Sequence, residues 1–117
     1  MPTDFRDGRT FPRRGRTPLG GFLWLARVFD KGRASVAGTI HDYIYPCPLD
    51  QGVFKHWGIT DAEFDEAMRA SKDDAALLAW IGSKVSMQRR DAANEWILRE
   101  KSQSLDRQDR EEGASGA

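Results

Sequence analysis

Three residues near the middle of the chain carry the side chains of a thiol-based catalytic group. His41, Cys47 and Asp50 lie within ten positions of one another, in a stretch that Pro46 and Pro48 stiffen. An imidazole beside a thiol favours the nucleophilic thiolate, and a carboxylate orients the imidazole. However, the spacing matches no nucleophile motif, and a free cysteine is often a buried packing residue. Two interpretations of Cys47 therefore stay open, a nucleophile in a small enzyme and an apolar filler.

A string of charges interrupts the most apolar segment of the chain. On a helix, Arg27 and Asp30 are i, i+3 neighbours, and so are Asp30 and Arg33. One interpretation is a clamp for an anion or carboxylate, because guanidinium groups bind such groups in bidentate geometry. The alternative is an intrahelical or interhelical ion-pair network on a solvated helix face. With the turn that follows, the candidate ligand-binding residues are Arg27, Asp30, Lys31, Arg33, His41, Tyr45, Cys47 and Asp50.

The first 18 residues are rich in arginine, proline and glycine. Five arginines alternate with Phe5 and Phe11, a pattern that can contact phosphates and stack on bases. Nucleic-acid binding through this arm is therefore a second alternative function. It is disfavoured because 18 Lys and Arg balance 18 Asp and Glu, which leaves no net positive field. A solvated arm, or one that docks on the acidic stretch at residues 61–66, agrees better with this balance.

Metal, cofactor and membrane binding receive no support. His41 and His56 are the only histidines and Cys47 is the only cysteine, so no metal-ligand spacing is present. We predict no metal site and no cofactor. The longest mostly apolar run is about half the ~20 residues that a membrane span needs. A cytoplasmic protein without membrane contact is expected, since a single cysteine cannot form an intramolecular disulfide.

Short helices must position these residues. Apolar spacing predicts helices over about 21–37, 51–57 and 61–71, another from residue 73 or 74 to about 85, and a last one around 92–97. Thr60 and Glu63 form a capping box, and Gly38 and Gly58 are suited to end helices. Gly32 inside the first helix predicts a close backbone contact or a bend, because glycine there costs about 1 kcal/mol relative to alanine.

Between the first two helices the pattern changes to alternation. Residues 40–48 are expected to form a short strand or extended segment that the two prolines end, after which Asp50 caps the next helix. An unpaired strand exposes hydrogen-bonding groups, so we expect this segment to pair with its own copy in a homodimer.

The predicted fold class is all-α, a small orthogonal or bundle-like domain of four to five short helices with one extended segment near residues 40–48. The arm comprises residues 1–18 and the single helical domain residues 19–101. Residues 102–117 are expected to form a disordered polar tail, because they contain too little apolar surface to offset the entropy of ordering.

The segment Leu19-Gly-Gly-Phe-Leu-Trp-Leu-Ala-Arg-Val-Phe-Asp-Lys-Gly-Arg-Ala, followed by Ala37-Gly-Thr and Tyr45-Pro-Cys-Pro-Leu-Asp50, resembles an uncharacterised bacterial family, domain of unknown function 5069. The resemblance covers residues 17–81. It implies a bacterial origin and a small helical domain that forms most of its protein. It implies no reaction and no catalytic roles.

From these observations we predict a non-enzymatic binding or accessory module. A small anionic ligand or a protein partner would lie against the first helix and the turn at residues 41–50. The alternative is a small enzyme that uses Cys47, His41 and Asp50.

Overall fold

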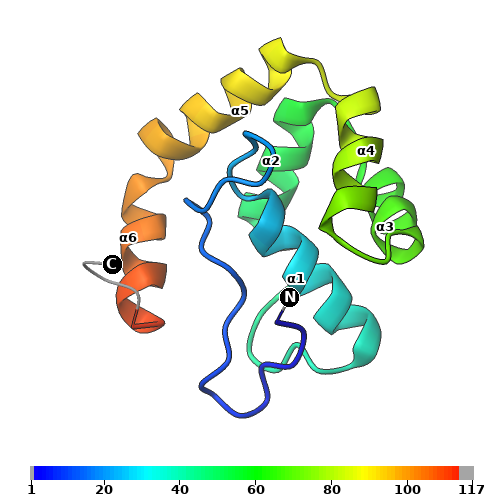
Figure 1. Cartoon of the computed structure of the whole chain (residues 1–117). Coiled ribbons are helices and arrows are strands. Elements are labelled where there is room, and N and C mark those ends of the chain that lie inside the picture. Colours follow the sequence, from blue (N-terminus) through cyan, green and yellow to red (C-terminus); the bar gives the residue numbers. More distant parts are fainter. Residues whose placement is uncertain (1, 114–117) are drawn as a thin grey trace.

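Six helices form the part of the chain that the computed structural model describes, residues 2–113. They are α1 (Leu25–Ala37), α2 (Pro48–Trp57), α3 (Asp61–Ala70), α4 (Asp74–Lys84), α5 (Met87–Glu100) and α6 (Ser102–Glu111). In Figure 1, α1 runs through the middle, α3 and α4 lie on one side, and α5 and α6 form an arc on the other. Helix α1 packs on α3, and α2 packs on α5. The all-α class is confirmed, with six helices instead of four or five.

Two predicted capping features are present at helix ends. Thr60 and Glu63 form the predicted capping box at the start of α3. Gly38 ends α1 with φ 74°, a left-handed conformation that glycine adopts without steric cost. Helix α1 begins at Leu25 rather than near residue 21, because Gly21 and Trp24 have φ of 83° and 71° and cannot continue a right-handed helix.

Helix α2 begins two residues before the predicted N-cap. Cys47 caps it, Pro48 is its first residue, and Asp50 completes a capping box by accepting from the Cys47 N–H. Pro48 therefore starts a helix where we expected it only to end an extended segment. The reason is that the first helical position needs no N–H donor and favours the fixed φ of proline.

Residues 41–42 and 45–46 form turns, Pro48 already belongs to α2, and no strand is found at 40–48 in the described residues 2–113. His41 has φ 57°, so the alternation of side chains that a strand requires is broken at its second residue. The strand on which we based the pairing of two copies is thus not present in the described chain.

The expected disordered tail is wrong for residues 102–111, which form α6; residues 114–117 of that tail lie outside the described residues, as does Met1. Leu105 is buried, and its side chain and the Trp24 ring both lie next to Gly15 of the arm. Asp109 is buried and pairs with Arg14 and Arg16. The arm and α6 order each other, which supplies the buried surface that the tail sequence lacks on its own.

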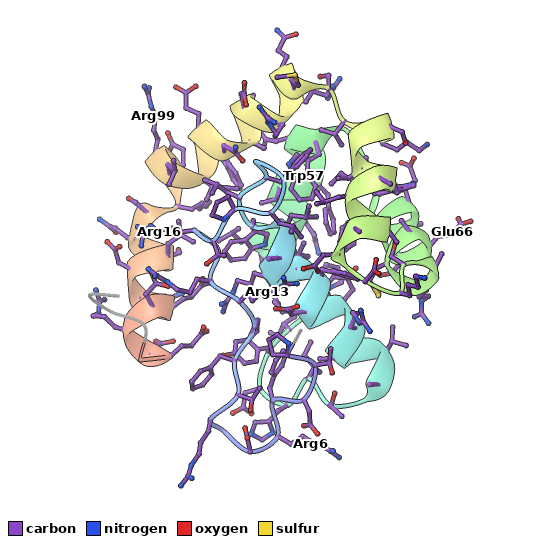
Figure 2. The ribbon with its side chains drawn as sticks, in the orientation of Figure 1. Arg6, Arg13, Arg16, Trp57, Glu66 and Arg99 are labelled. Atoms are coloured by element: carbon purple, nitrogen blue, oxygen red, sulfur yellow. The ribbon has the colours of Figure 1, made fainter. Side chains whose placement is uncertain are left out.

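One apolar cluster connects all six helices. Trp24 and Trp57 are fully buried in it, and Trp80 and Trp96 pack against it while partly exposed. Figure 2 shows Trp57 inside, whereas Arg6, Glu66 and Arg99 project from the periphery. At Gly32 an added Cβ would lie 3.1 Å from a Met68 side-chain atom, so side chains, rather than the predicted backbone, approach this glycine.

Candidate functional site

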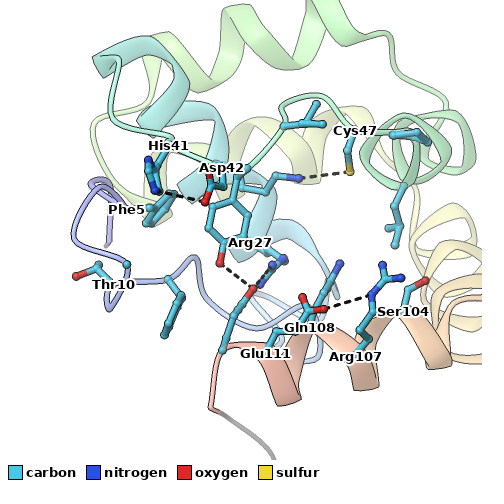
Figure 3. A pocket seen from close by; sticks show the side chains of 18 of the residues that line it. Phe5, Thr10, Arg27, His41, Asp42, Cys47, Ser104, Arg107, Gln108 and Glu111 are labelled. Carbon is cyan, nitrogen blue, oxygen red and sulfur yellow. Dashed lines mark hydrogen bonds and ion pairs between the residues drawn. The ribbon is translucent and has the colours of Figure 1, made fainter.

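A pocket of about 650 Å³ opens between the arm, the turns at residues 41–49, α1 and α6. Figure 3 looks into it: Phe5 and Thr10 come from the arm, His41, Asp42 and Cys47 from the turns, and Arg107, Gln108 and Glu111 from α6. Arg27 and Lys31 of α1 also line it. The pocket exists because the arm and α6 enclose space beside α1 without filling it.

Arg27 and Tyr43 bind the carboxylate of Glu112. Arg27 donates from Nη1 to Oε1 at 3.0 Å and from Nη2 to Oε2 at 2.6 Å, and the Tyr43 hydroxyl donates to Oε2 at 2.9 Å. Burial alone lowers the pKa of Arg27, but the hydrogen bond and charge of Glu112 outweigh it, so the pKa is raised. Burial and Glu112 also raise the pKa of Tyr43. Arg27 and Tyr43 thus form a clamp on the pocket wall that binds both oxygens of this carboxylate.

Lys31 lies one turn further along α1 and joins Cys47 to Asp50. Its Nζ is 2.7 Å from Asp50 Oδ2 and 3.4 Å from Cys47 Sγ, the contact drawn as a dashed line beside Cys47 in Figure 3. Asp50 is fully buried and also accepts from Trp24 Nε1 at 2.7 Å. Lys31 and the partly exposed Cys47 both line the pocket.

Asp30 does not contact Cys47 or Asp50 but binds Arg13 of the arm. Its carboxylate accepts from the backbone N–H of Arg13 at 2.8 Å and from the Arg13 guanidinium, which also pairs with Asp74. Burial raises the pKa of Asp30, and the bonds from Arg13 oppose this rise. Arg27, Asp30 and Lys31 thus each pair with a group outside α1. A solvated helix face is the wrong description, since Arg27, Asp30 and Lys31 are all buried.

Two of the predicted binding residues, Arg33 and Tyr45, lie away from the pocket. Arg33 donates to the Lys72 carbonyl at 3.3 Å and lies over the Phe29 ring. The Tyr45 hydroxyl donates to Asp65 at 2.6 Å, and burial and this bond raise the pKa of Tyr45. Neither Arg33 nor Tyr45 lines the pocket.

The predicted trio is not assembled as a hydrogen-bonded chain. His41 is exposed, and its Nε2 lies 3.4 Å from the Asp42 carboxylate. The Asp50 carboxylate is directed to Lys31, Trp24 and the Cys47 N–H. Lys31, not His41, is thus the ionisable group beside the Cys47 sulfur.

Two pocket residues carry buried polar atoms without a partner. Within residues 2–113, neither Arg27 Nε nor Gln108 Oε1 has a hydrogen-bond partner. A buried unpaired donor or acceptor costs about 1–3 kcal/mol. A ligand in the pocket is one way to satisfy these atoms.

Sequence reasoning missed Glu112 and Gln108 because both follow residue 102, where we expected disorder. Opposite charge was the available signal, since the arm contains five arginines and residues 102–112 contain four carboxylates. The arm does not dock on residues 61–66 as proposed. Instead Arg13 binds Asp30 and Asp74, and Arg14 and Arg16 bind Asp109.

No group of three or more His, Cys, Asp or Glu within residues 2–113 is placed to hold a metal ion. None of the helices in that range combines the length and apolar character needed to cross a membrane.

The chain belongs to the family described as Domain of unknown function (DUF5069), which it matches over residues 9–116. The resemblance seen at residues 17–81 is therefore confirmed, and it extends through α5 and α6. No curated protein matches the chain.

Proposed function

We propose that this member of the family is a binding module that takes up a small organic carboxylate in the pocket beside α1. The clamp of Arg27 and Tyr43 would hold the carboxylate of the ligand. The single observation that carries the proposal is that these two residues already bind a carboxylate, that of Glu112, in bidentate geometry.

The position of Glu112 supports exchange with a ligand. Glu112 follows the last residue of α6, so its carboxylate reaches the clamp from a helix end rather than from a packed helix interior. A free carboxylate offers Arg27 and Tyr43 the same two oxygens. It has to compete with Glu112, so its apparent affinity is reduced by the fraction of time for which the clamp is occupied.

The other walls of the pocket favour an organic ligand over an inorganic anion. Phe5 and Tyr43 stack edge to face, with ring centroids 5.3 Å apart, and Ile44 is 68% exposed beside them. The volume falls in the range of small-molecule sites, about 300–1,000 Å³. A recess of this volume between the arm, α1 and α6 suits a small molecule better than the surface of a protein partner.

The geometry supports binding rather than catalysis by the predicted trio. A His-assisted thiol requires His41 to contact Cys47, whereas His41 is paired with Asp42. The Asp50 carboxylate is committed to Lys31. Arm arginines that would contact phosphates are bound to Asp30, Asp74 and Asp109, which argues against nucleic acid.

Chemical rescue tests the proposal, with benzoate as the probe and benzamide as its neutral control. Glu112→Ala leaves Arg27 buried without a carboxylate, so the variant should lose thermal stability and regain it when benzoate is added. Calorimetric titration should show benzoate binding to the wild-type chain, and binding to Glu112→Ala tighter by at least about tenfold.

The matched control is Glu66→Ala, since Glu66 is exposed on α3 and does not line the pocket. It should bind benzoate as the wild type does, and no variant should bind benzamide. If benzoate rescues Glu112→Ala but does not bind the wild-type chain, Glu112 is a permanent structural partner and the proposal is wrong. Equal binding of benzoate and benzamide would also contradict it.

A further inference from the structure

Cys47 is an unusual residue for the position that it occupies. Its Sγ accepts the capping hydrogen bond from the Asp50 N–H at 3.4 Å. Sulfur is a weak acceptor, and serine, threonine, aspartate and asparagine are the residues that cap helices best. A serine here would keep the capping box and shorten the bond. The sulfur therefore adds nothing to the cap that an oxygen would not supply better, which points to a role in chemistry.

The groups around the sulfur suit a negative charge on it. The Lys31 ammonium lies 3.4 Å from Sγ, and the Asp50 N–H is directed at it from the first turn of the ten-residue helix α2. An ammonium group and a helix N-terminus both interact more strongly with a thiolate than with a thiol. Lys31 is 4% exposed, and its ammonium group is fixed in place between the Asp50 carboxylate and the sulfur.

The same pocket presents a second, independent sign of a ligand. Arg27 is 2% exposed, lines the pocket, and has no partner for its Nε within the described chain. Arg27 and Lys31 are four residues apart on α1, about 6 Å along the helix axis. Both lie against the Trp24 ring, at 5.5 Å and 6.0 Å from its centroid. A molecule a few atoms long can therefore reach Arg27 with a carboxylate and Cys47 with a sulfur.

We propose that Cys47 undergoes thiol–disulfide exchange with a low-molecular-weight disulfide that carries carboxylate groups, and so holds half of it covalently in the pocket. The Cys47 thiolate attacks one sulfur of the disulfide, that S–S bond breaks, and a new S–S bond forms to Sγ. The other half leaves as a thiolate and takes up, through solvent, the proton that Cys47 released. The exchange needs no additional oxidant. This inference rests on the proposed carboxylate binding and names a class of ligand for it.

Intact-mass measurements on the full chain test the exchange with three disulfides. Glutathione disulfide carries carboxylates, bis(2-hydroxyethyl) disulfide is neutral, and cystamine is cationic. Each rate for the folded chain is divided by the rate for the urea-unfolded chain, which removes the intrinsic reactivity of the reagent. At low ionic strength the ratio for glutathione disulfide should exceed that for cystamine by about tenfold, and salt should reduce the difference.

Cys47→Ser is the matched control, because it keeps a good helix cap and removes the only thiol. It should fold and take up no adduct, and a reductant should release the adduct from the wild-type chain. Equal ratios for the three reagents, or modification only after unfolding, would overturn the inference. If Cys47→Ser still binds benzoate while the folded wild-type chain remains unmodified, this inference fails and the proposed carboxylate binding stands.

Discussion

Lys31 and Asp50 meet where α1 packs beside the start of α2, with Nζ 2.7 Å from Oδ2 and both side chains at most 5% exposed. Asp50 also accepts from Trp24 Nε1 and from the Cys47 N–H, so one carboxylate satisfies donors from two elements. A buried ion pair with such additional bonds holds its partners strictly in place. It thereby sets the position of the Cys47 sulfur at the edge of the pocket.

Asp50→Asn should lower the free energy of unfolding by about 3 kcal/mol, because the Lys31 charge then stays buried without a counterion. Urea unfolding followed by Trp fluorescence measures the change. Asp42→Asn provides the control, since the Asp42 side chain is 89% exposed and its replacement should change stability by less than about 0.5 kcal/mol. A loss below about 1 kcal/mol for Asp50→Asn would show that the pair does not organise this region.

Acid should release α6 and the arm before it unfolds the rest of the protein. The hydrogen bond from Arg14, with help from Arg16, holds the pKa of Asp109 below its usual value of 3.8. A carboxyl whose folded pKa is lowered stabilises the fold above the unfolded pKa, and this stability is lost as pH falls through the folded pKa. The protection factors of α6 amides, which correct hydrogen exchange for its intrinsic pH dependence, should therefore fall as the pH drops below about 4.

Asp109→Asn is the variant that isolates this effect. Its α6 protection factors should be lower near neutral pH and should depend less on pH between about pH 5 and pH 3. Asp30 contributes with the opposite sign, since burial raises its pKa: its share of stability is present below 3.8 and is lost as pH rises through the folded value. An unchanged acid profile in Asp109→Asn would place the acid-sensitive contact elsewhere.

Two helical glycines should respond in opposite directions to alanine. At Gly52 in α2, an added Cβ would lie 2.5 Å from the Trp96 ring of α5, too close without a shift of one helix. At Gly82 in α4, an added Cβ meets nothing within 4 Å. Gly82→Ala should therefore stabilise by about 0.5–1 kcal/mol, the difference in helix propensity, whereas Gly52→Ala should destabilise by about 1–3 kcal/mol.

Thermal unfolding of the two variants measured side by side gives the comparison. If Gly52→Ala is as stable as Gly82→Ala, the contact between α2 and α5 is loose at Trp96. That result would also weaken the assignment of the stacked His56 and Trp96 rings, 4.5 Å apart, to a fixed interface.

Most of the helices could be predicted from neighbouring residues, because a helix end depends on contacts a few positions apart. The Thr60–Glu63 box spans three positions, and Gly38 acts on the turn directly before it. The start of α2 at Cys47 and Pro48 was predicted wrongly for a related reason. A proline before a helix and a proline that ends a strand look alike until the backbone around them is known.

The sequence by itself determined the all-α class and the family, because these depend on local spacing and composition. It also pointed to four residues of the pocket wall, namely Arg27, Lys31, His41 and Cys47. Only the tertiary structure decided which charges meet. Arg27 and Glu112 are 85 positions apart, and Arg14 and Asp109 are 95 apart. At such separations in the sequence, each arginine has many acidic residues as possible partners. The packing of the helices decides which of them is buried beside it. Helix α6, which forms one wall of the pocket, is held by such pairs and by the buried Leu105.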